Sequence, residues 1–221
     1  NNTAFSSVVA HEYGHFIVNR LGLGQGGFGE GFSDTCSMGL FDDPIIGRNF
    51  FTNGGVIRTP DSANQQSPCT STAVHTCGQI IGNVFWEMRK NLAARYGDVI
   101  GSNSGTGFTI LRDHHVDWMQ ITIGGTGSNF LNSAHAQTAI EWLTIDDNDG
   151  DLSNGTPHYA QICPAFAQSG ISCPAVSPII FTYPDGRPTL VPANQSFSFR
   201  MIASEQLVAP QPNTGRVSYR V

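Results

Sequence analysis

The 221-residue sequence has few charged residues, and it contains a single lysine, Lys90. Charged residues make up only 13% of the chain, and the formal net charge is −6. This balance argues against nucleic acid and against an anionic membrane surface as partners. The sequence also lacks any apolar run near the ~18 residues that a transmembrane helix needs. A hydrophobic content of 39% suffices for a sizeable core in one domain, or in one domain with a small addition, and indicates no oligomeric state.

Cysteine is scarce as well, with five residues and no pair in the Cys-x-x-Cys spacing, which argues against a structural zinc site. The short separations of Cys69 from Cys77 and of Cys163 from Cys173 predict two local disulfides. The remaining Cys36 is most simply interpreted as a buried small hydrophobe. Local disulfides and loops rich in Gly, Asn, Ser and Thr favour a secreted protein.

One apolar stretch near the start of the sequence contains the pattern His-Glu-x-x-His. Histidines four residues apart share one face of an α-helix, so the imidazoles of His11 and His15 can reach one divalent metal ion. Glu12 then projects beside them toward a water on the metal, although the same short pattern also occurs in helices with two surface histidines. A metzincin would continue with Gly and His where this sequence has Val18 and Leu21, so that branch is excluded.

A third metal ligand must therefore come from another segment. A glycine-rich turn at residues 22–27 ends the first predicted helix, and a second helix is predicted from Gly29. Glu30 and Asp34 share one face of that helix. Glu30 would complete a His2Glu zinc site with an open fourth position, and Asp34 would accept the other ring N–H of a ligand histidine. In the alternative interpretation, both acids only cap or solvate the start of the helix.

These motifs resemble the gluzincin metallopeptidases of the thermolysin and fungalysin type. The resemblance covers about residues 4–95 and rests on His11-Glu12-Tyr13-Gly14-His15, Gly29-Glu30-Gly31-Phe32-Ser33-Asp34 and Val74-His75-Thr76. It implies peptide-bond hydrolysis with His11, His15 and Glu30 as zinc ligands and Glu12 as the general base. It also implies that His75 stabilises the transition state, whereas a histidine at a helix start is otherwise a partly exposed side chain. The linker from His15 to Glu30 is short for these relatives, so we interpret the chain as a separate branch.

The fold class that follows is the mainly α catalytic lobe of a zincin-type α+β metallopeptidase at residues 1–174. Residues 175–221 are expected to be the start of a β-sandwich module, with a hairpin turn at Pro184-Asp185-Gly186. Its predicted strands are residues 179–183, 189–191, 196–201 and 216–221. Such peptidases carry a β-rich lobe before the zinc helix, and this sequence opens almost directly on that helix. We therefore expect a fragment or a processed product.

Further elements follow from periodicity and turn residues. A long helix is predicted at residues 72–96, ending at Gly97, and another at residues 129–144. The core-facing stripe of the first contains Val74, Cys77, Ile81, Val84, Phe85, Met88 and Leu92, and an adjacent stripe offset from the core contains His75, Gln79, Gly82 and Trp86. Residues 40–70 are predicted to be a turn-rich connection that frames a substrate cleft, and residues 101–127 to alternate turns with short β-branched pieces.

Oxygen-bearing side chains concentrate in residues 146–155, where alternating acids resemble half of a calcium loop. The candidate calcium ligands are Asp147, Asp149 and Asp151. No glutamate completes an EF-hand, and an ordinary solvated acidic turn explains the pattern equally well.

After this loop, Thr156 and Pro157 predict the start of another helix. His158 on that helix is a candidate second imidazole of the active site. Adjacent side chains point in different directions on any regular element, so His114 and His115 are interpreted as surface residues or substrate contacts and not as ligands of one metal.

Together these features predict a secreted zinc metalloendopeptidase acting on protein or peptide substrates, with Zn²⁺ as cofactor and Ca²⁺ as a candidate second ion. A catalytically silent zinc or carbohydrate-binding module is one alternative, but structural zinc needs no base such as Glu12. A different zinc hydrolase, such as a deacetylase or an aminopeptidase, is the other alternative. An aminopeptidase needs an acidic anchor for the substrate amine, normally upstream of the motif, and the few residues before His11 contain none.

Overall fold

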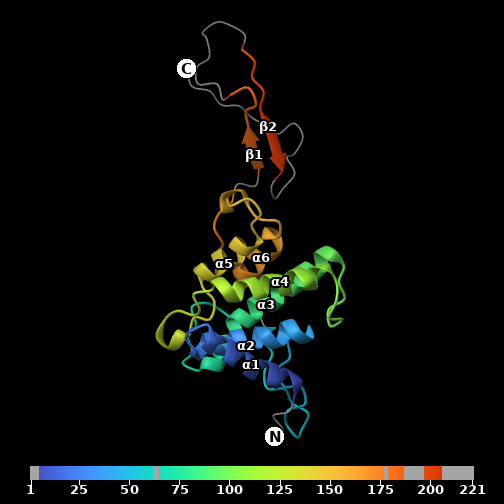
Figure 1. The fold of residues 1–221 in the computed structure, drawn as a ribbon, viewed down its shortest axis with the longest axis vertical. Helices are drawn as coiled ribbons and strands as arrows, with labels where there is room; N and C mark the ends of the chain where they lie inside the picture. Colours follow the sequence, from blue (N-terminus) through green and yellow to red (C-terminus); the bar gives the residue numbers. More distant parts are fainter. Residues whose placement is uncertain (1–4, 62–64, 177–178, 187–196, 206–221) are drawn as a thin grey trace.

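The computed structural model describes residues 5–61, 65–176, 179–186 and 197–205. In these residues a helical body is followed by a small two-stranded sheet, which agrees with a helical lobe followed by the start of a β region (Figure 1). The α-helices are α1 (Ser6–Arg20), α2 (Gly26–Phe41), α3 (Val74–Tyr96), α4 (Thr106–Ile121), α5 (Ala136–Asp146) and α6 (Tyr159–Gln168). The short 3₁₀ turns are η1 (Ser128–Phe130) and η2 (Leu152–Asn154), and the strands are β1 (Ile179–Thr182) and β2 (Ile202–Glu205).

Helix α3 is the centre of the helical body, because it packs against α2, α4 and α6 (Figure 1). Its predicted core stripe is buried except for Val74, which is half-buried, and Gly97 ends the helix in a left-handed conformation. The predicted offset stripe is wrong at Trp86, which is only 3% exposed and belongs to the core. A helix with neighbours on several sides buries more than one stripe.

Glycines allow α1, α2 and α3 to approach one another closely. A Cβ on Gly14 of α1 would lie 2.5 Å from Ser33 Cα of α2. One on Gly31 of α2 would lie 2.2 Å from the carbonyl oxygen of Gly78 in α3. Neither distance is compatible with a side-chain carbon. These two contacts therefore fix how near the faces of the three helices come.

The expectation of turns and β-branched pieces at residues 101–127 is wrong for most of that range, because residues 106–121 form α4. Phe108, Leu111, His115 and Trp118 are buried at the three- and four-residue spacing of a helix. Asp98 accepts a hydrogen bond from the Phe108 backbone N–H (2.8 Å), which satisfies one of the unpaired donors at the helix start.

The predicted helix at residues 129–144 begins later, at Ala136, because residues 128–130 form the 3₁₀ turn η1. The helix predicted from Thr156 and Pro157 begins at Tyr159. The Thr156 hydroxyl donates to the carboxylate of Asp146 (2.5 Å) instead of capping that helix. The turn-rich connection predicted at residues 40–70 starts slightly later, because α2 extends to Phe41. The described residues from 42 to 73 contain no helix or strand.

Both predicted disulfides are present, Cys69–Cys77 and Cys163–Cys173. The first closes the turn that leads into α3. The second joins α6 to the segment that follows it. Cys36 is a free, half-buried thiol, and burial raises its pKa to about 12, which agrees with a small hydrophobe rather than a reactive thiolate.

Strands β1 and β2 pair antiparallel, with Ile179 opposite Glu205 and Thr182 opposite Ile202. A turn forms at the predicted Pro184-Asp185-Gly186, where the Gly186 N–H donates to the Tyr183 carbonyl (2.9 Å). The strand predicted at residues 196–201 is wrong for 197–201, because the pairing starts at Ile202. The strands predicted at 189–191 and 216–221 lie outside the described residues. No helix in the described part of the chain is long and apolar enough to cross a bilayer.

Candidate metal centre

Helices α1 and α2 bring the ligand atoms of His11, His15 and Glu30 within 4.8 Å of one another. The Nε2 atoms of the two histidines are 3.1 Å apart, His11 Nε2 is 3.4 Å from Glu30 Oε2, and His15 Nε2 is 3.6 Å from Glu30 Oε1. Ligand atoms ~2.0–2.1 Å from a tetrahedral metal ion are about 3.3 Å apart. The spacing of these three side chains therefore fits one metal ion.

The outer nitrogen of each imidazole has its own hydrogen-bond acceptor. His11 Nδ1 is 2.8 Å from Asp34 Oδ1, the contact that the sequence predicts for Asp34. His15 Nδ1 is 2.9 Å from Gln25 Oε1, and the Gln25 amide also donates to the His15 backbone carbonyl (3.1 Å). Acceptors at both Nδ1 atoms leave both Nε2 lone pairs pointing inward. This arrangement sets the tautomer that a metal ion needs.

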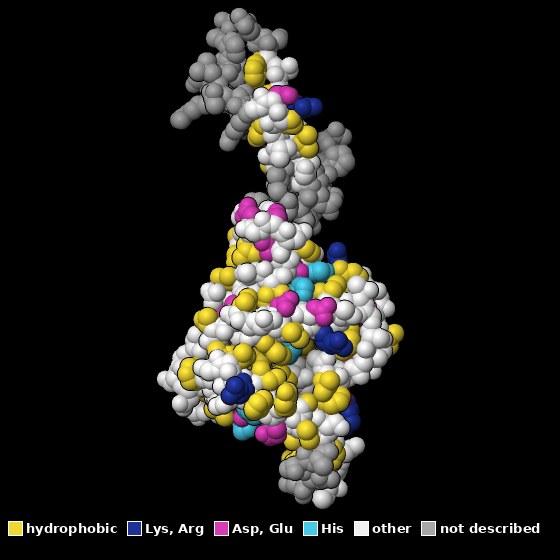
Figure 2. All heavy atoms as spheres, in the orientation of Figure 1, with side chains coloured by type: hydrophobic (Ala, Val, Ile, Leu, Met, Phe, Trp, Pro, Cys, Tyr) yellow, Lys and Arg dark blue, Asp and Glu magenta, His cyan; other side chains and the backbone are white. Residues whose placement is uncertain are grey.

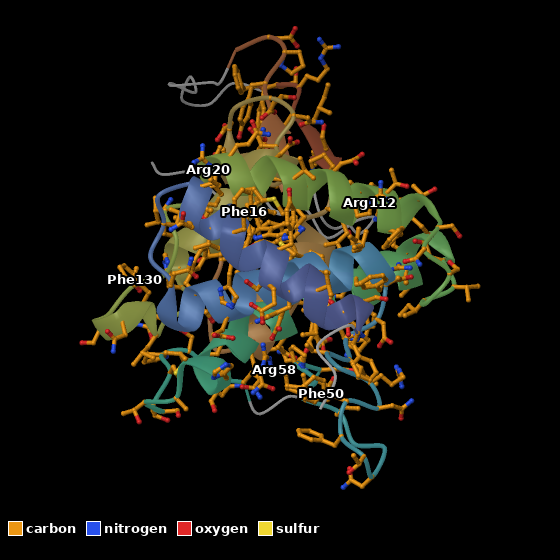
Figure 3. All side chains as sticks on the ribbon, turned by 60° about the horizontal axis from the view of Figure 1, so that its bottom comes forward. Phe16, Arg20, Phe50, Arg58, Arg112 and Phe130 are labelled. Atoms are coloured by element: carbon orange, nitrogen blue, oxygen red, sulfur yellow. A yellow bond between two sulfur atoms is a disulfide. The ribbon has the colours of Figure 1, made fainter. Side chains whose placement is uncertain are left out.

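Arg58, which belongs to the connection between α2 and α3, also reaches this centre. Its guanidinium donates to both carboxylate oxygens of Asp34 (2.8 and 2.9 Å) and lies 3.3 Å from Glu30 Oε2 and from both ring nitrogens of His11. Figure 3 shows Arg58 on one side of α1 and Phe16 on the other side, toward α4. A bidentate arginine holds the Asp34 carboxylate in a fixed orientation.

The carboxylates of Asp34 and Glu30 shape the electrostatics of this centre. Burial lowers the pKa of His11, but hydrogen bonds to Asp34 and Glu30 outweigh burial and raise it to about 9. Burial raises the pKa of Glu30, yet the hydrogen bond from His11 brings it below its usual value.

The two predicted catalytic side chains are near these ligands. Glu12 is exposed on α1, one residue beyond His11, and its charge is among those that raise the pKa of Arg58. His75 is at the start of α3, with its side chain 62% exposed and its Nε2 3.3 Å from Glu30 Oε2. Among the described residues, the charged groups named here around the candidate ligands come from three helices and one connection.

The candidate calcium ligands lie in one turn, in which Asp149 and Asp151 are exposed and Asp147 is half-buried, and each accepts hydrogen bonds from nearby groups. Asp147 accepts from the Gly150 N–H (2.6 Å), and Asp149 accepts from the Asp151 N–H (3.0 Å). Asp151 accepts from both the backbone and the hydroxyl of Ser153 (2.9 and 2.6 Å). Among the described residues, neither group of converging metal-ligand atoms includes these three acids. Calcium binding at this turn stays a prediction.

The remaining histidines are arranged differently from the prediction. His115 is not a surface residue, since it is only 4% exposed and lies between α4 and α2, where its Nε2 is 2.9 Å from the Thr35 hydroxyl. His114 points away from it and, with Asp146 and His158, forms a second group of converging ligand atoms. His158 therefore belongs to that group and is not part of the ligand set of His11, His15 and Glu30.

A large apolar groove of about 700 Å³ lies between α1, α2 and α4. Its lining includes the exposed side chains of Val9, Tyr13, Leu40 and Val116. Figure 2 shows hydrophobic side chains gathered over α1 and α2 on this face. The groove borders the face of α1 that does not carry His11 and His15, so it is separate from the metal ligands.

Gln25 and Arg58 were not predicted from the sequence. Gln25 lies in a glycine-rich turn and Arg58 in a turn-rich connection, and neither belongs to a spacing pattern. Comparisons with known proteins found no matching family model, no similar curated protein and no similar solved structure.

Proposed function

We propose that the protein is a zinc-dependent metalloendopeptidase that acts on protein or peptide substrates, of the gluzincin class that its motifs resemble. The observation that carries this proposal is the convergence of two imidazole Nε2 atoms and one carboxylate. The exposed Glu12 lies on α1, the helix that carries the two histidines. Two histidines, one glutamate and an open position form a typical catalytic zinc site. The two disulfides support secretion, because such bonds persist in oxidising compartments.

His11, His15 and Glu30 would hold the ion, which supplies an acidified water nucleophile and polarises the scissile carbonyl. Glu12 accepts the proton of the attacking water and passes it to the leaving amine. His75 donates a hydrogen bond to the oxyanion that develops on the carbonyl. The ligands are held in position by Asp34, Gln25 and Arg58, which make no contact with the substrate in this scheme.

The decisive experiment separates metal binding from chemistry by comparing two isosteric variants. Glu30→Gln removes the ligand charge, so zinc content and activity toward a quenched peptide should both fall. Glu12→Gln should retain full zinc content and lose about 10²–10⁴-fold in activity, because only the proton transfer is lost. Full zinc occupancy in Glu30→Gln would show that the ligand assignment is wrong. Full activity in Glu12→Gln would show that Glu12 is not the general base.

The same assay separates the competing classes. A silent zinc or carbohydrate-binding module would bind zinc but cleave neither casein nor a quenched peptide at any pH. A deacetylase would release acetate from an acetylated substrate without cleaving the peptide. An aminopeptidase would cleave only substrates with a free N-terminal amine. Chelator-sensitive cleavage of a peptide blocked at both ends supports the endopeptidase.

A further inference from the structure

The second group of converging ligand atoms lies in the part of the helical body that contains α4, α5 and α6. Three separate segments supply it: His114 from α4, Asp146 from the end of α5, and His158 immediately before α6. No residue of this group belongs to the candidate peptidase centre.

Asp146 is oriented so that only one of its oxygens faces the two imidazoles. Its Oδ2 accepts hydrogen bonds from the Thr156 hydroxyl (2.5 Å) and the His158 backbone N–H (2.6 Å). Its Oδ1 is 2.9 Å from His114 Nε2 and 2.5 Å from His158 Nδ1. The two donors to Oδ2 thus orient the carboxylate, and Oδ1 points between the two imidazole nitrogens.

The opposite nitrogen of His158 also has a partner. His158 Nε2 is 2.7 Å from the hydroxyl of Tyr96, at the end of α3. A tyrosine hydroxyl can donate or accept. It can therefore accept from the Nε2–H of the tautomer whose Nδ1 lone pair binds a metal ion. Such an acceptor beside a ligand histidine is the usual support of a metal site.

Access and charge also suit an ion. The Asp146 side chain is 1% exposed, whereas those of His114 and His158 are 18% and 13% exposed, so an ion can enter between them. The carboxylate of Asp146 supplies the negative charge of the group, and it lies against both imidazoles.

We propose that His114, Asp146 and His158 form a second metal site for a divalent ion that prefers imidazole ligands, with Zn²⁺ as its probe. Ca²⁺ and Mg²⁺ are disfavoured because they prefer oxygen ligands alone. The ion takes the place of the two N–H hydrogens that face Asp146 Oδ1, and these protons move to the opposite ring nitrogens or to solvent. Each nitrogen moves away from Oδ1 to the ~3.3 Å spacing of ligand atoms in a tetrahedral site. The bound ion joins α4 to the segment between α5 and α6, so its effect is to stabilise that part of the fold.

The test uses a protein in which the first centre has been removed. His11→Ala/His15→Ala, stripped with a chelator and checked for its helical circular dichroism, should bind one Zn²⁺ by calorimetry. Bound Co²⁺ should show visible absorption bands typical of nitrogen and oxygen ligands. The wild-type chain should bind two Zn²⁺. No zinc binding by the folded double variant overturns the proposal, whatever the outcome of the peptidase assays.

Matched substitutions locate the ion without removing the hydrogen bonds. His114→Gln and His158→Asn each keep an N–H donor where the ring nitrogen was, but lose the metal ligand. In the double-variant background each should weaken Zn²⁺ binding by about a hundredfold or more, since loss of a ligand's hydrogen-bond partner alone costs about 10–100-fold. Tyr96→Phe removes only such a partner, so it should weaken Zn²⁺ binding by about 10–100-fold.

His135→Gln is the control, because His135 precedes α5 at the end opposite to Asp146, and its Nε2 is 2.9 Å from the Gly124 carbonyl. It should leave zinc affinity unchanged. If the double variant does not fold, the wild-type background serves instead, where His114→Gln should reduce the zinc stoichiometry from two to one. Equal affinity of His114→Gln, His158→Asn and the control would overturn the assignment.

Discussion

The histidines of this chain differ mainly in what their ring nitrogens face. His11 lies beside two carboxylates, so its pKa is raised to about 9. His115 is buried among aromatic side chains. Burial lowers the pKa of His115 to about 3 from 6.5. The Thr35 hydroxyl donates to the Phe32 carbonyl (2.7 Å) and therefore accepts from His115 Nε2–H. His115 is thus a satisfied neutral residue of the core.

This environment predicts acid sensitivity. Between pH 6.5 and 3 the unfolded chain binds a proton at His115 that the folded chain does not. The free energy of unfolding should therefore decrease as the pH falls below about 6.5, and the effect should be absent above that pH. His115→Gln keeps the donor to Thr35 but cannot titrate. Between pH 6.5 and 4, the urea midpoint measured with chelator should therefore fall less steeply for His115→Gln than for the wild-type protein. Parallel curves for the two proteins would contradict the prediction.

His75 carries the second residue-level prediction. Its exposed imidazole, 3.3 Å from Glu30 Oε2, can turn toward a substrate bound at the metal. A hydrogen bond made mainly in the transition state affects kcat and kcat/KM together. His75→Ala should lower both by about a hundredfold and leave KM and zinc content little changed. A loss below about threefold, with normal zinc content, would leave His75 without a catalytic role.

At the residue scale the sequence was informative where a pattern is local. Residues four apart on a helix share a face whatever the rest of the fold does, so His11 with His15 and Glu30 with Asp34 could be paired from spacing alone. Arg58 could not, because its position depends on how a turn-rich connection packs under two helices. The partners of His114 are likewise 32 and 44 residues away, at Asp146 and His158.

At the scale of elements, the centre depends on the close approach of α2 to α3. A Cβ at Gly78 would lie 2.7 Å from the Gly31 nitrogen and 2.8 Å from Glu30 Cβ. Gly78→Ala should therefore push α2 away and displace Glu30. We expect a loss of about 1–3 kcal/mol in the free energy of unfolding, together with weaker zinc binding. Urea unfolding and zinc titration on the same preparation measure both.

Gly39→Ala is the matched control within α2. Its Cβ would meet Phe85 Cζ at 3.4 Å and His115 Nδ1 at 3.6 Å, which are ordinary contacts. Removing a glycine from a helix without a clash should be neutral or should stabilise by about 0.4–1 kcal/mol. If Gly78→Ala matched this control in stability and in zinc affinity, the close approach would not be what positions Glu30.

Long, strongly periodic helices such as α3 could be predicted, and their ends followed from residues such as Gly97. Helix α4 could not, because Thr109, Ile110 and Val116 favour strands locally and its flanks are rich in glycine and serine. Its buried residues pack against α3 and α5, and this tertiary contact outweighs the local preference. The start of α6 was misplaced for a similar reason, since the Thr156 hydroxyl bonds to Asp146 instead of capping the helix.

For the molecule as a whole, the boundary predicted at residue 174 can be tested by truncation. The disulfide Cys163–Cys173 and the hydrogen bond from the Tyr159 hydroxyl to the Pro174 carbonyl (2.9 Å) attach the end of the helical part to α6. Among the described residues, β1 and β2 pair with each other and make no extensive contact with a helix. A two-stranded sheet alone is marginally stable, so it can add little to the stability of the helical body.

A chain ending at residue 176 should therefore keep the Tm of the longer chain to within about 2 °C, because a change of 1 kcal/mol shifts Tm by only about 2–4 °C at this size. Zinc stoichiometry should also be unchanged, since every proposed ligand lies before α6. A control chain ending at residue 170 loses Cys173 and the Pro174 carbonyl, and should unfold at a clearly lower temperature. Equal losses of Tm in both truncated chains would place residues 177–221 within the folding unit and move the domain boundary.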